Sequence, residues 1–114
     1  MRVRRSLAAL PLLAALTVTG AATAGSDKPA AAVVHTVVIE NLQFSPAQLT
    51  VHRGERIVWV NKDLFPHTVT ADAKAFDSGS IAANTSWRYL AAKSGSFPYS
   101  CTFHPTMKGQ ITVQ

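Results

Sequence analysis

Three side chains that can bind a metal lie close together near the C-terminus. Cys101, His104 and Met107 follow one another at intervals of three residues, in a segment that Pro105 stiffens. Cysteine occurs once in the chain, so an internal disulfide is excluded. A thiolate, an imidazole and a thioether at this spacing offer soft donors to one metal ion.

One of the four histidines is placed to complete this set. His67 follows a proline in a loop that closes onto a predicted strand, and loops at one end of a β-sandwich would bring it beside Cys101 and His104. His35 begins a predicted strand, and His52 alternates onto the polar side of another. We therefore expect His35 and His52 to be solvated.

The donor types favour copper. Two imidazoles, one thiolate and one weakly bound thioether suit a trigonal copper site with a long axial methionine. Structural zinc sites are closed tetrahedra of cysteine and histidine, and magnesium or calcium would need a carboxylate cluster that the sequence does not show. Zinc, another copper geometry and a metal-free fold remain the alternatives.

The N-terminus has the layout of a secretory signal peptide. Arg2, Arg4 and Arg5 precede an apolar run over residues 7–16, and Ala22-Thr23-Ala24 supplies the small residues of a cleavage site. The run is shorter than the roughly 20 residues of a membrane span. We predict a signal peptide over residues 1–24, a periplasmic or otherwise exported protein, and no stable membrane anchor. The arginine pair also fits a twin-arginine signal, so the export route stays open.

Charge and thiol content agree with export. The chain of 114 residues has a formal net charge of +5, but three of its 11 basic residues belong to the predicted signal peptide. The remaining 90 residues carry eight basic and six acidic side chains, a balance that does not favour nucleic acid as a partner. A single thiol in an oxidising compartment is a liability unless something, such as a metal, holds it.

The elements that must position these residues are strands. From His35 onward apolar residues alternate with period two about seven times, and turn signals separate the runs. The pattern is typical of an antiparallel sandwich or barrel over residues 35–114, preceded by a flexible segment at 25–34. Cys101 shares one face with Phe97 and Tyr99, so its sulfur is expected to point inward.

These motifs resemble a known family. Cys101-x₂-His104-x₂-Met107 with an upstream Pro66-His67 is similar to the type 1 (blue) copper proteins of the cupredoxin family, in the plastocyanin and amicyanin class. The short ligand loop is most like that of amicyanin. The resemblance covers about residues 35–114 and extends to segments around Phe44-Ser45-Pro46, Val58-Trp59-Val60-Asn61, Phe76-Asp77-Ser78-Gly79 and Gly95-Ser96-Phe97-Pro98-Tyr99.

The resemblance implies both the fold and the function. The fold would be an all-β, antiparallel Greek-key β-sandwich of about seven to eight strands. His67, Cys101 and His104 would be strong ligands of one type 1 copper ion, and Met107 the weak axial ligand. The protein would carry single electrons between redox partners, would not be an enzyme, and would be a monomer.

One position departs from the family. Several members have asparagine after the upstream histidine, and its side chain ties the two ligand loops together; this chain has Thr68. We expect the threonine hydroxyl to supply part of that bonding. We also expect the Thr68 N–H to donate to the Cys101 sulfur.

A docking surface for the redox partner is also expected. Apolar residues flank the predicted ligands, among them Leu64, Phe65 and Phe103, and they form either an exposed patch around the edge of His104 or part of the core. A transient encounter needs only a small patch of this kind. Three lysines are candidates to rim it and steer an acidic partner, or else belong to a plain solvated surface: Lys62, Lys93 and Lys108.

Other functions fit less well. A carrier, buffer or resistance protein that delivers copper rather than electrons would use the same ligands, but the methionine-rich tracts expected of it are missing. A multicopper enzyme needs more histidines than His35 and His52 supply. A hydrolase lacks a Gly-x-Ser-x-Gly elbow, and the ordered set of four ligands disfavours a metal-free adhesion domain.

Overall fold

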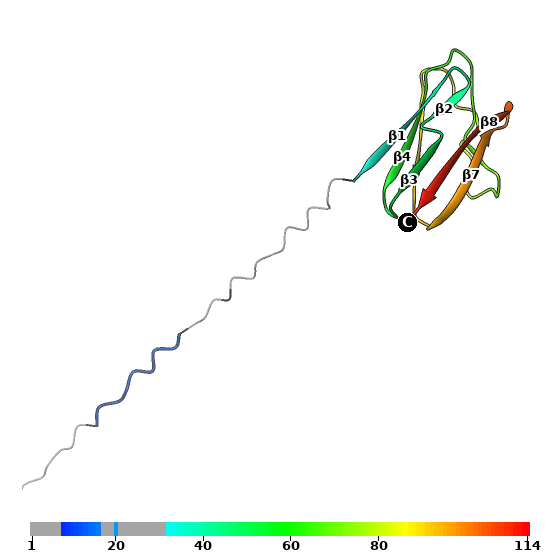
Figure 1. The fold of residues 1–114 in the computed structure, drawn as a ribbon. Coiled ribbons are helices and arrows are strands. Elements are labelled where there is room, and N and C mark those ends of the chain that lie inside the picture. Colours follow the sequence, from blue (N-terminus) through cyan, green and yellow to red (C-terminus); the bar gives the residue numbers. More distant parts are fainter. Residues whose placement is uncertain (1–7, 17–19, 21–31) are drawn as a thin grey trace, which may run out of the picture.

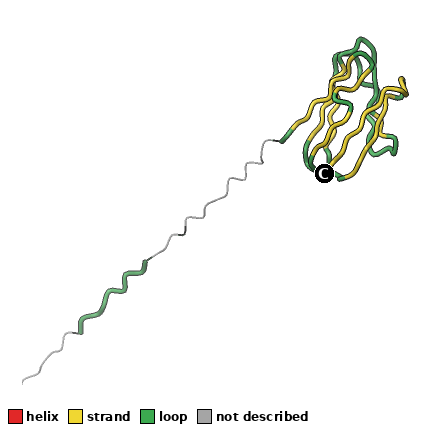
Figure 2. The backbone as a smooth tube through the Cα atoms, in the orientation of Figure 1, coloured by secondary structure: helices red, strands yellow, loops and turns green. Residues whose placement is uncertain are grey.

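The computed structural model describes residues 8–16, 20 and 32–114. The cleavage site predicted at the end of segment 1–24 lies outside the described residues, and so does most of segment 25–34, which was predicted to be flexible. The last residue of that segment, Val34, is instead the first residue of a strand. Within the described part, every regular element is a strand (Figure 2). Those residues form no helix of the length and apolarity needed to span a bilayer.

Eight strands form two four-stranded sheets that pack face to face (Figure 1). The first sheet has the order β2-β1-β4-β6 and the second the order β3-β8-β7-β5. The strands are β1 (Val34–Glu40), β2 (Gln43–Ser45), β3 (Gln48–Val51), β4 (Arg56–Asn61), β5 (Thr70–Ala71), β6 (Ser86–Leu90), β7 (Gly95–Cys101) and β8 (His104–Val113). This confirms the predicted all-β sandwich.

Both sheets are mixed, which differs from the expected antiparallel pairing. β1 and β4 run parallel, as do β3 and β8, whereas the other neighbouring strands are antiparallel. The reason is connectivity. After the β1–β2 hairpin the chain crosses to the other sheet for β3, and β4 then returns beside β1 in the same direction. Alternation of apolar residues indicates which face of a strand is buried, but it does not indicate which strand lies beside it or in which direction that strand runs.

The core lies between the sheets and is rich in aromatic rings. Trp59 on β4 and Tyr99 on β7 face each other across it at 5.7 Å between ring centroids, and the Trp59 Nε1–H donates to the Tyr99 hydroxyl at 3.2 Å. Burial raises the pKa of Tyr99 to about 12, even though this hydrogen bond acts in the opposite direction. Trp59 therefore satisfies a hydroxyl that packing removes from water.

Two elements near the predicted ligands differ from expectation. β8 begins at His104, so the segment expected to be a loop is the first part of a strand. Cys101 pairs with His104 while Ser100 pairs with Lys108, a register shift that places residues 105–107 in a bulge. β5 is only Thr70–Ala71, shorter than the predicted strand, and His67 lies in the loop before it, as predicted, where it forms an isolated bridge with Ile81.

Candidate metal centre

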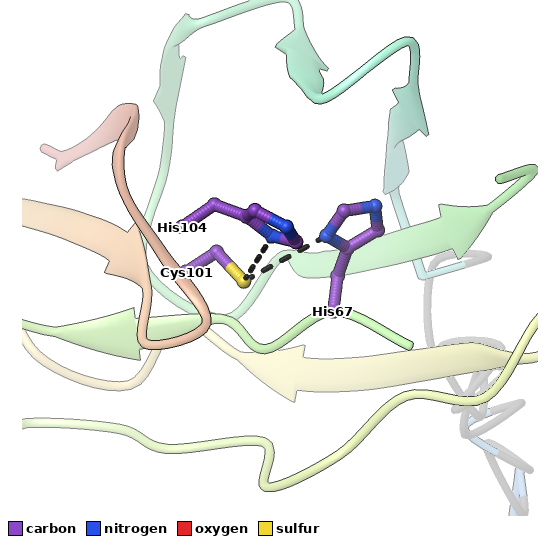
Figure 3. Close-up of side chains that lie close together, drawn as sticks. All are labelled: His67, Cys101 and His104. Carbon is purple, nitrogen blue, oxygen red and sulfur yellow. Dashed lines mark hydrogen bonds between the residues drawn. The ribbon is translucent and has the colours of Figure 1, made fainter. Parts of the chain in front are cut away.

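The donor atoms of His67, Cys101 and His104 meet at one end of the sandwich. All three lie within 4.8 Å of one another. The Cys101 Sγ is 3.7 Å from the Nδ1 of His67 and 3.8 Å from the Nδ1 of His104. Figure 3 shows the two rings approaching the sulfur from different parts of the chain. The predicted meeting of these three side chains is confirmed.

The spacing of these atoms suits a metal bound by three ligands. Bonds of about 2.3 Å to sulfur and about 2.0 Å to nitrogen are typical of a first-row metal. At a trigonal angle of about 120°, such bonds separate sulfur from nitrogen by about 3.7 Å. The observed separations of 3.7 and 3.8 Å match that value. One thiolate and two imidazoles are also the strong donors of a trigonal copper site.

Cys101 and His104 reach the centre through a tight turn. Cys101 ends β7 and His104 begins β8, with only Thr102 and Phe103 between them. Cys101 is fully buried on the inward face that Tyr99 shares, as the alternation predicts. His104 is half-buried. The turn therefore places a shielded sulfur beside an imidazole with an accessible edge.

Asn61, the last residue of β4, shapes the loop that carries His67. Its buried amide nitrogen donates to the carbonyls of Phe65 and Ile81 at 2.9 and 3.0 Å, and its amide oxygen accepts the Asp63 N–H at 3.0 Å. His67 and Ile81 also exchange backbone hydrogen bonds of 3.1 and 2.7 Å. These bonds fix the approach of the fully buried His67 ring.

Asp63 is a residue that the sequence analysis missed. One of its carboxylate oxygens lies 2.7 Å from the Nε2 of His67, so the ring presents Nδ1 to the centre. The carboxylate also accepts the N–H groups of Asn41 and Leu42 at 2.8 and 3.1 Å. Burial raises the pKa of Asp63, but the hydrogen bonds from Leu42, His67 and Asn41 outweigh it and lower the pKa overall. The one available signal was an aspartate four residues before a candidate ligand.

Thr68 behaves as expected for the position that departs from the family. Its N–H donates to the Cys101 Sγ at 3.3 Å. Its hydroxyl accepts the N–H of Thr102 at 2.9 Å and lies 3.1 Å from the Thr102 hydroxyl. The threonine hydroxyl thus links the loop of His67 to the turn after Cys101.

The other candidate ligands lie in different settings. Met107 is buried on the inward face of β8, at the end of the bulge. His52 is exposed, as predicted. His35 is only half-buried, but its Nε2 lies 3.0 Å from a carboxylate oxygen of Glu55, so it is paired rather than simply solvated.

The apolar residues beside the ligands are exposed rather than part of the core. Leu64 is 88% exposed, Phe103 54% and Phe65 43%. The Phe65 ring lies 5.1 Å from the ring of His67 and 5.9 Å from that of His104. We call Leu64, Phe65 and Phe103 the apolar rim.

One of the three lysines expected near the apolar rim lies elsewhere. Lys93 comes just before Gly95, the first residue of β7, which pairs with Val113 at the far end of β8. Seven residues of strand, about 20 Å, separate that end from Cys101. Lys62 follows β4 directly and Lys108 pairs with Ser100, so both lie toward the end that holds the centre.

Comparison with known sequences gives a consistent result. A family model described as Cupredoxin-like domain matches residues 8–113. Amicyanin from Paracoccus versutus is 32% identical over 96 residues, which is 80% of this chain and 71% of that protein. Amicyanin-alpha from Methylorubrum extorquens is 28% identical over 96% of this chain and 99% of its own length. A plastocyanin from Synechococcus is 29% identical, with 90% and 89% covered.

Solved structures share the architecture. An oxidised amicyanin variant superimposes with a TM-score of 0.66 and 26% identity, covering 73% of this chain and 82% of that one. A copper-containing nitrite reductase from Thermus scotoductus gives a TM-score of 0.70 at 25% identity. That match covers 78% of this chain but only 24% of the reductase.

Proposed function

The chain belongs to the cupredoxin family, and on that premise we propose that it is a small blue copper protein that transfers single electrons. The observation that carries the proposal is the meeting of one buried thiol and two imidazoles, with both sulfur–nitrogen separations at the value expected for ligands of one metal ion. Amicyanins and plastocyanins are its relatives in sequence. The cofactor of such a protein is one type 1 copper ion, and the donor set described above fits it.

We assign the ligands as follows. His67 and His104 would hold the copper through Nδ1, and the thiol of Cys101 would lose its proton and serve as a thiolate ligand. Met107 would be the fourth, weakly held ligand, a role supported by its buried place at the end of the bulge of β8. When bound, copper supplies the one-electron change between Cu(II) and Cu(I).

The surrounding residues suit this chemistry because they hold the ligands still. Asp63 orients the ring of His67, Asn61 fixes the loop around it, and Thr68 holds both the sulfur and the turn that follows. Among the described residues, every buried side-chain nitrogen or oxygen has a hydrogen-bond partner. A frame without unsatisfied groups resists rearrangement, so the ligands need not move when an electron arrives or leaves.

The electron enters and leaves through the exposed edge of His104. His104 as a whole residue is partly exposed, and the apolar rim (Leu64, Phe65 and Phe103) is exposed near it. A small apolar surface is desolvated easily and releases its partner quickly, as a transient redox complex requires. We propose that the partner is a redox protein that docks on the apolar rim, with Lys62 and Lys108 favouring an acidic surface.

The remaining parts of the proposal concern the whole protein. We propose that residues 1–24 are a signal peptide, that the protein is exported and that it works as a monomer. The likeness to a copper-containing nitrite reductase covers only 24% of that enzyme, so it supports a shared fold and does not argue for shared catalysis. We therefore propose no substrate turnover.

Repeated redox cycling of the copper-loaded chain tests electron transfer against copper delivery. An electron carrier retains its copper through many cycles of reduction and reoxidation in the presence of a Cu(I) chelator, and exchanges electrons rapidly. Loss of the metal to the chelator on the first reduction would instead assign the protein to copper delivery.

A further inference from the structure

The hydroxyl of Thr68 belongs to a chain of hydrogen bonds that extends well beyond the metal centre. It lies 3.0 Å from the hydroxyl of Thr70, which in turn donates to the carboxylate of Asp77 at 3.1 Å. The same Asp77 oxygen accepts the N–H of Gly79 at 2.9 Å. The chain thus runs from the turn after Cys101 to the loop that follows β5.

The carboxylate sets the direction of every hydroxyl in this chain. An ionised carboxylate only accepts hydrogen bonds, so the single proton of Thr70 is directed to Asp77. The contact between Thr70 and Thr68 then requires Thr68 to donate. With its proton used, Thr68 has two lone pairs left, and these accept the N–H and the O–H of Thr102.

All of the bonding capacity of the Thr68 hydroxyl is therefore used. It donates once, to Thr70, and accepts twice, from Thr102. Without Asp77 the order of the hydroxyls could reverse, and Thr68 would have two arrangements instead of one. The backbone N–H of Thr68 donates to the Cys101 sulfur, so a change in the position of Thr68 alters that hydrogen bond.

We propose that Asp77 is a positioning residue for the metal centre, acting through Thr70 and Thr68 on the hydrogen bond to the Cys101 sulfur. A second contact supports this role for its loop. The hydroxyl of Ser78 accepts the N–H of Val69 at 2.7 Å, and the N–H of Ser78 donates to the Val69 carbonyl at 2.9 Å. The loop thus holds both the N–H and the carbonyl of Val69, the residue between Thr68 and Thr70. The spectroscopic consequences rest on the proposed copper function, but the hydrogen-bond chain does not.

Four variants of the full chain test the proposal. Asp77→Ala removes the acceptor, and Thr70→Val removes the connecting hydroxyl without changing charge. Asp77→Asn keeps an acceptor oxygen and is the conservative rescue. Asp72→Ala is the matched control, because it deletes an equal charge from an exposed aspartate of the same loop whose side chain is outside the chain of hydroxyls.

Amide hydrogen exchange without copper is the first measurement. We expect protection of the Thr68 and Thr102 N–H groups to fall about tenfold in Asp77→Ala and Thr70→Val. It should stay near wild type in Asp77→Asn and Asp72→Ala. Unchanged protection of the Trp59 and Ile111 amides shows that the core is intact. Equal protection of Thr68 and Thr102 in all variants overturns the proposal, whether or not the protein binds copper.

The reduction potential of the copper-loaded protein is the second measurement, and its sign separates two effects. Loss of a negative charge alone raises the potential, because it destabilises the more positive oxidised state. Weakening the N–H donation to sulfur lowers the potential. We expect a lower potential in Thr70→Val, and in Asp77→Ala relative to Asp72→Ala. Equal upward shifts in both aspartate variants, with no shift in Thr70→Val, would contradict the proposal.

Discussion

At the scale of single residues, Asp63 holds two features in place at once. It orients His67 through Nε2 and stabilises the turn between β1 and β2, where Asn41 and Leu42 both have positive φ (53° and 59°). A leucine in this region is strained by roughly 1–3 kcal/mol unless its surroundings compensate. The carboxylate that accepts both N–H groups supplies that compensation, so the turn and the ligand are coupled.

Replacing Asp63 should weaken copper binding. Loss of a carboxylate that orients a histidine ligand costs about ten- to a hundredfold in metal affinity, and we expect that range for Asp63→Ala in a competition titration with a chelator. Asp63→Asn retains an acceptor oxygen and should recover most of the affinity. An Asp63→Ala protein with wild-type affinity would show that the carboxylate does not act on His67.

Glu55, at the opposite end of the sandwich, should make stability depend on pH. Its pKa is lowered from the ordinary value of 4.5, first by the His52 N–H and then by the His35 side chain. A lowered pKa means that ionised Glu55 stabilises the fold above about pH 4.5 and that this contribution disappears as the pH falls through the lowered pKa. Urea unfolding should show Glu55→Gln less stable than wild type at pH 6, with a difference that shrinks toward pH 3. A constant difference would be inconsistent with this role.

At the scale of elements, the pairing of β7 with β8 determines how the Tyr99 ring packs in the core. Tyr99 lies opposite Gly109, and a Cβ at Gly109 would lie 2.3 Å from the Tyr99 hydroxyl oxygen and equally close to the ring carbon that bears it. The absence of a side chain at Gly109 is therefore what allows Tyr99 to reach Trp59.

Gly109→Ala should destabilise the protein by roughly 1–3 kcal/mol, the usual cost of overpacking a core. Tyr99→Phe alone should cost about 1 kcal/mol through the lost hydrogen bond with Trp59. The double variant should lose less than the two single changes together, because the added methyl group displaces the Tyr99 ring and so already breaks the hydrogen bond that Tyr99→Phe removes. Denaturant unfolding measures all three, and a Gly109→Ala protein of wild-type stability would argue against the packing described.

The loops that form the apolar rim should control electron exchange. Phe103→Ala removes an exposed ring beside His104, and we expect the electron self-exchange rate to fall roughly tenfold, the effect of about 1.4 kcal/mol of lost contact energy. Leu90→Ala is the control, since Leu90 is 42% exposed but pairs with Arg56 at the start of β4, away from the centre. Equal effects of the two variants would place the docking surface elsewhere.

Sequence reasoning predicted the strands and the donors Cys101 and His104 because both are encoded locally, whereas His67 was identified by its place in a loop after Pro66 and by the resemblance to the family. Alternation places Cys101 inward, and His104 is only three residues away. Asp63 was missed because its spacing of four residues from His67 was the one signal in the sequence, and its contact with Asn41, 22 residues earlier, leaves no local pattern. Lys93 was misplaced because proximity to the centre depends on the direction of β7 rather than on distance along the chain. The parallel pairs were missed because alternation does not specify neighbouring strands.

At the scale of the whole molecule, the metal centre joins segments that are otherwise far apart in the chain. His67 and Cys101 are 34 residues apart, and the centre lies where both sheets end. A ligand that binds only the folded state adds about 4 kcal/mol of stability at a thousand times its dissociation constant. For a domain of this size such a gain raises Tm by on the order of 20 °C.

Thermal unfolding with and without copper should show that increase. The Cys101→Ala variant, which lacks the thiolate, should show little of it. A wild-type Tm that does not respond to copper would mean that the three donors do not bind the metal as a unit.

The most direct test of the central claim is a spectroscopic titration of the metal-free full chain with one equivalent of Cu(II). We predict an intense blue thiolate-to-copper absorption band and a narrow copper hyperfine splitting in the EPR spectrum, both lost in Cys101→Ala. A pale or absent band, or a spectrum that Cys101→Ala leaves unchanged, would contradict the assignment of a type 1 copper site.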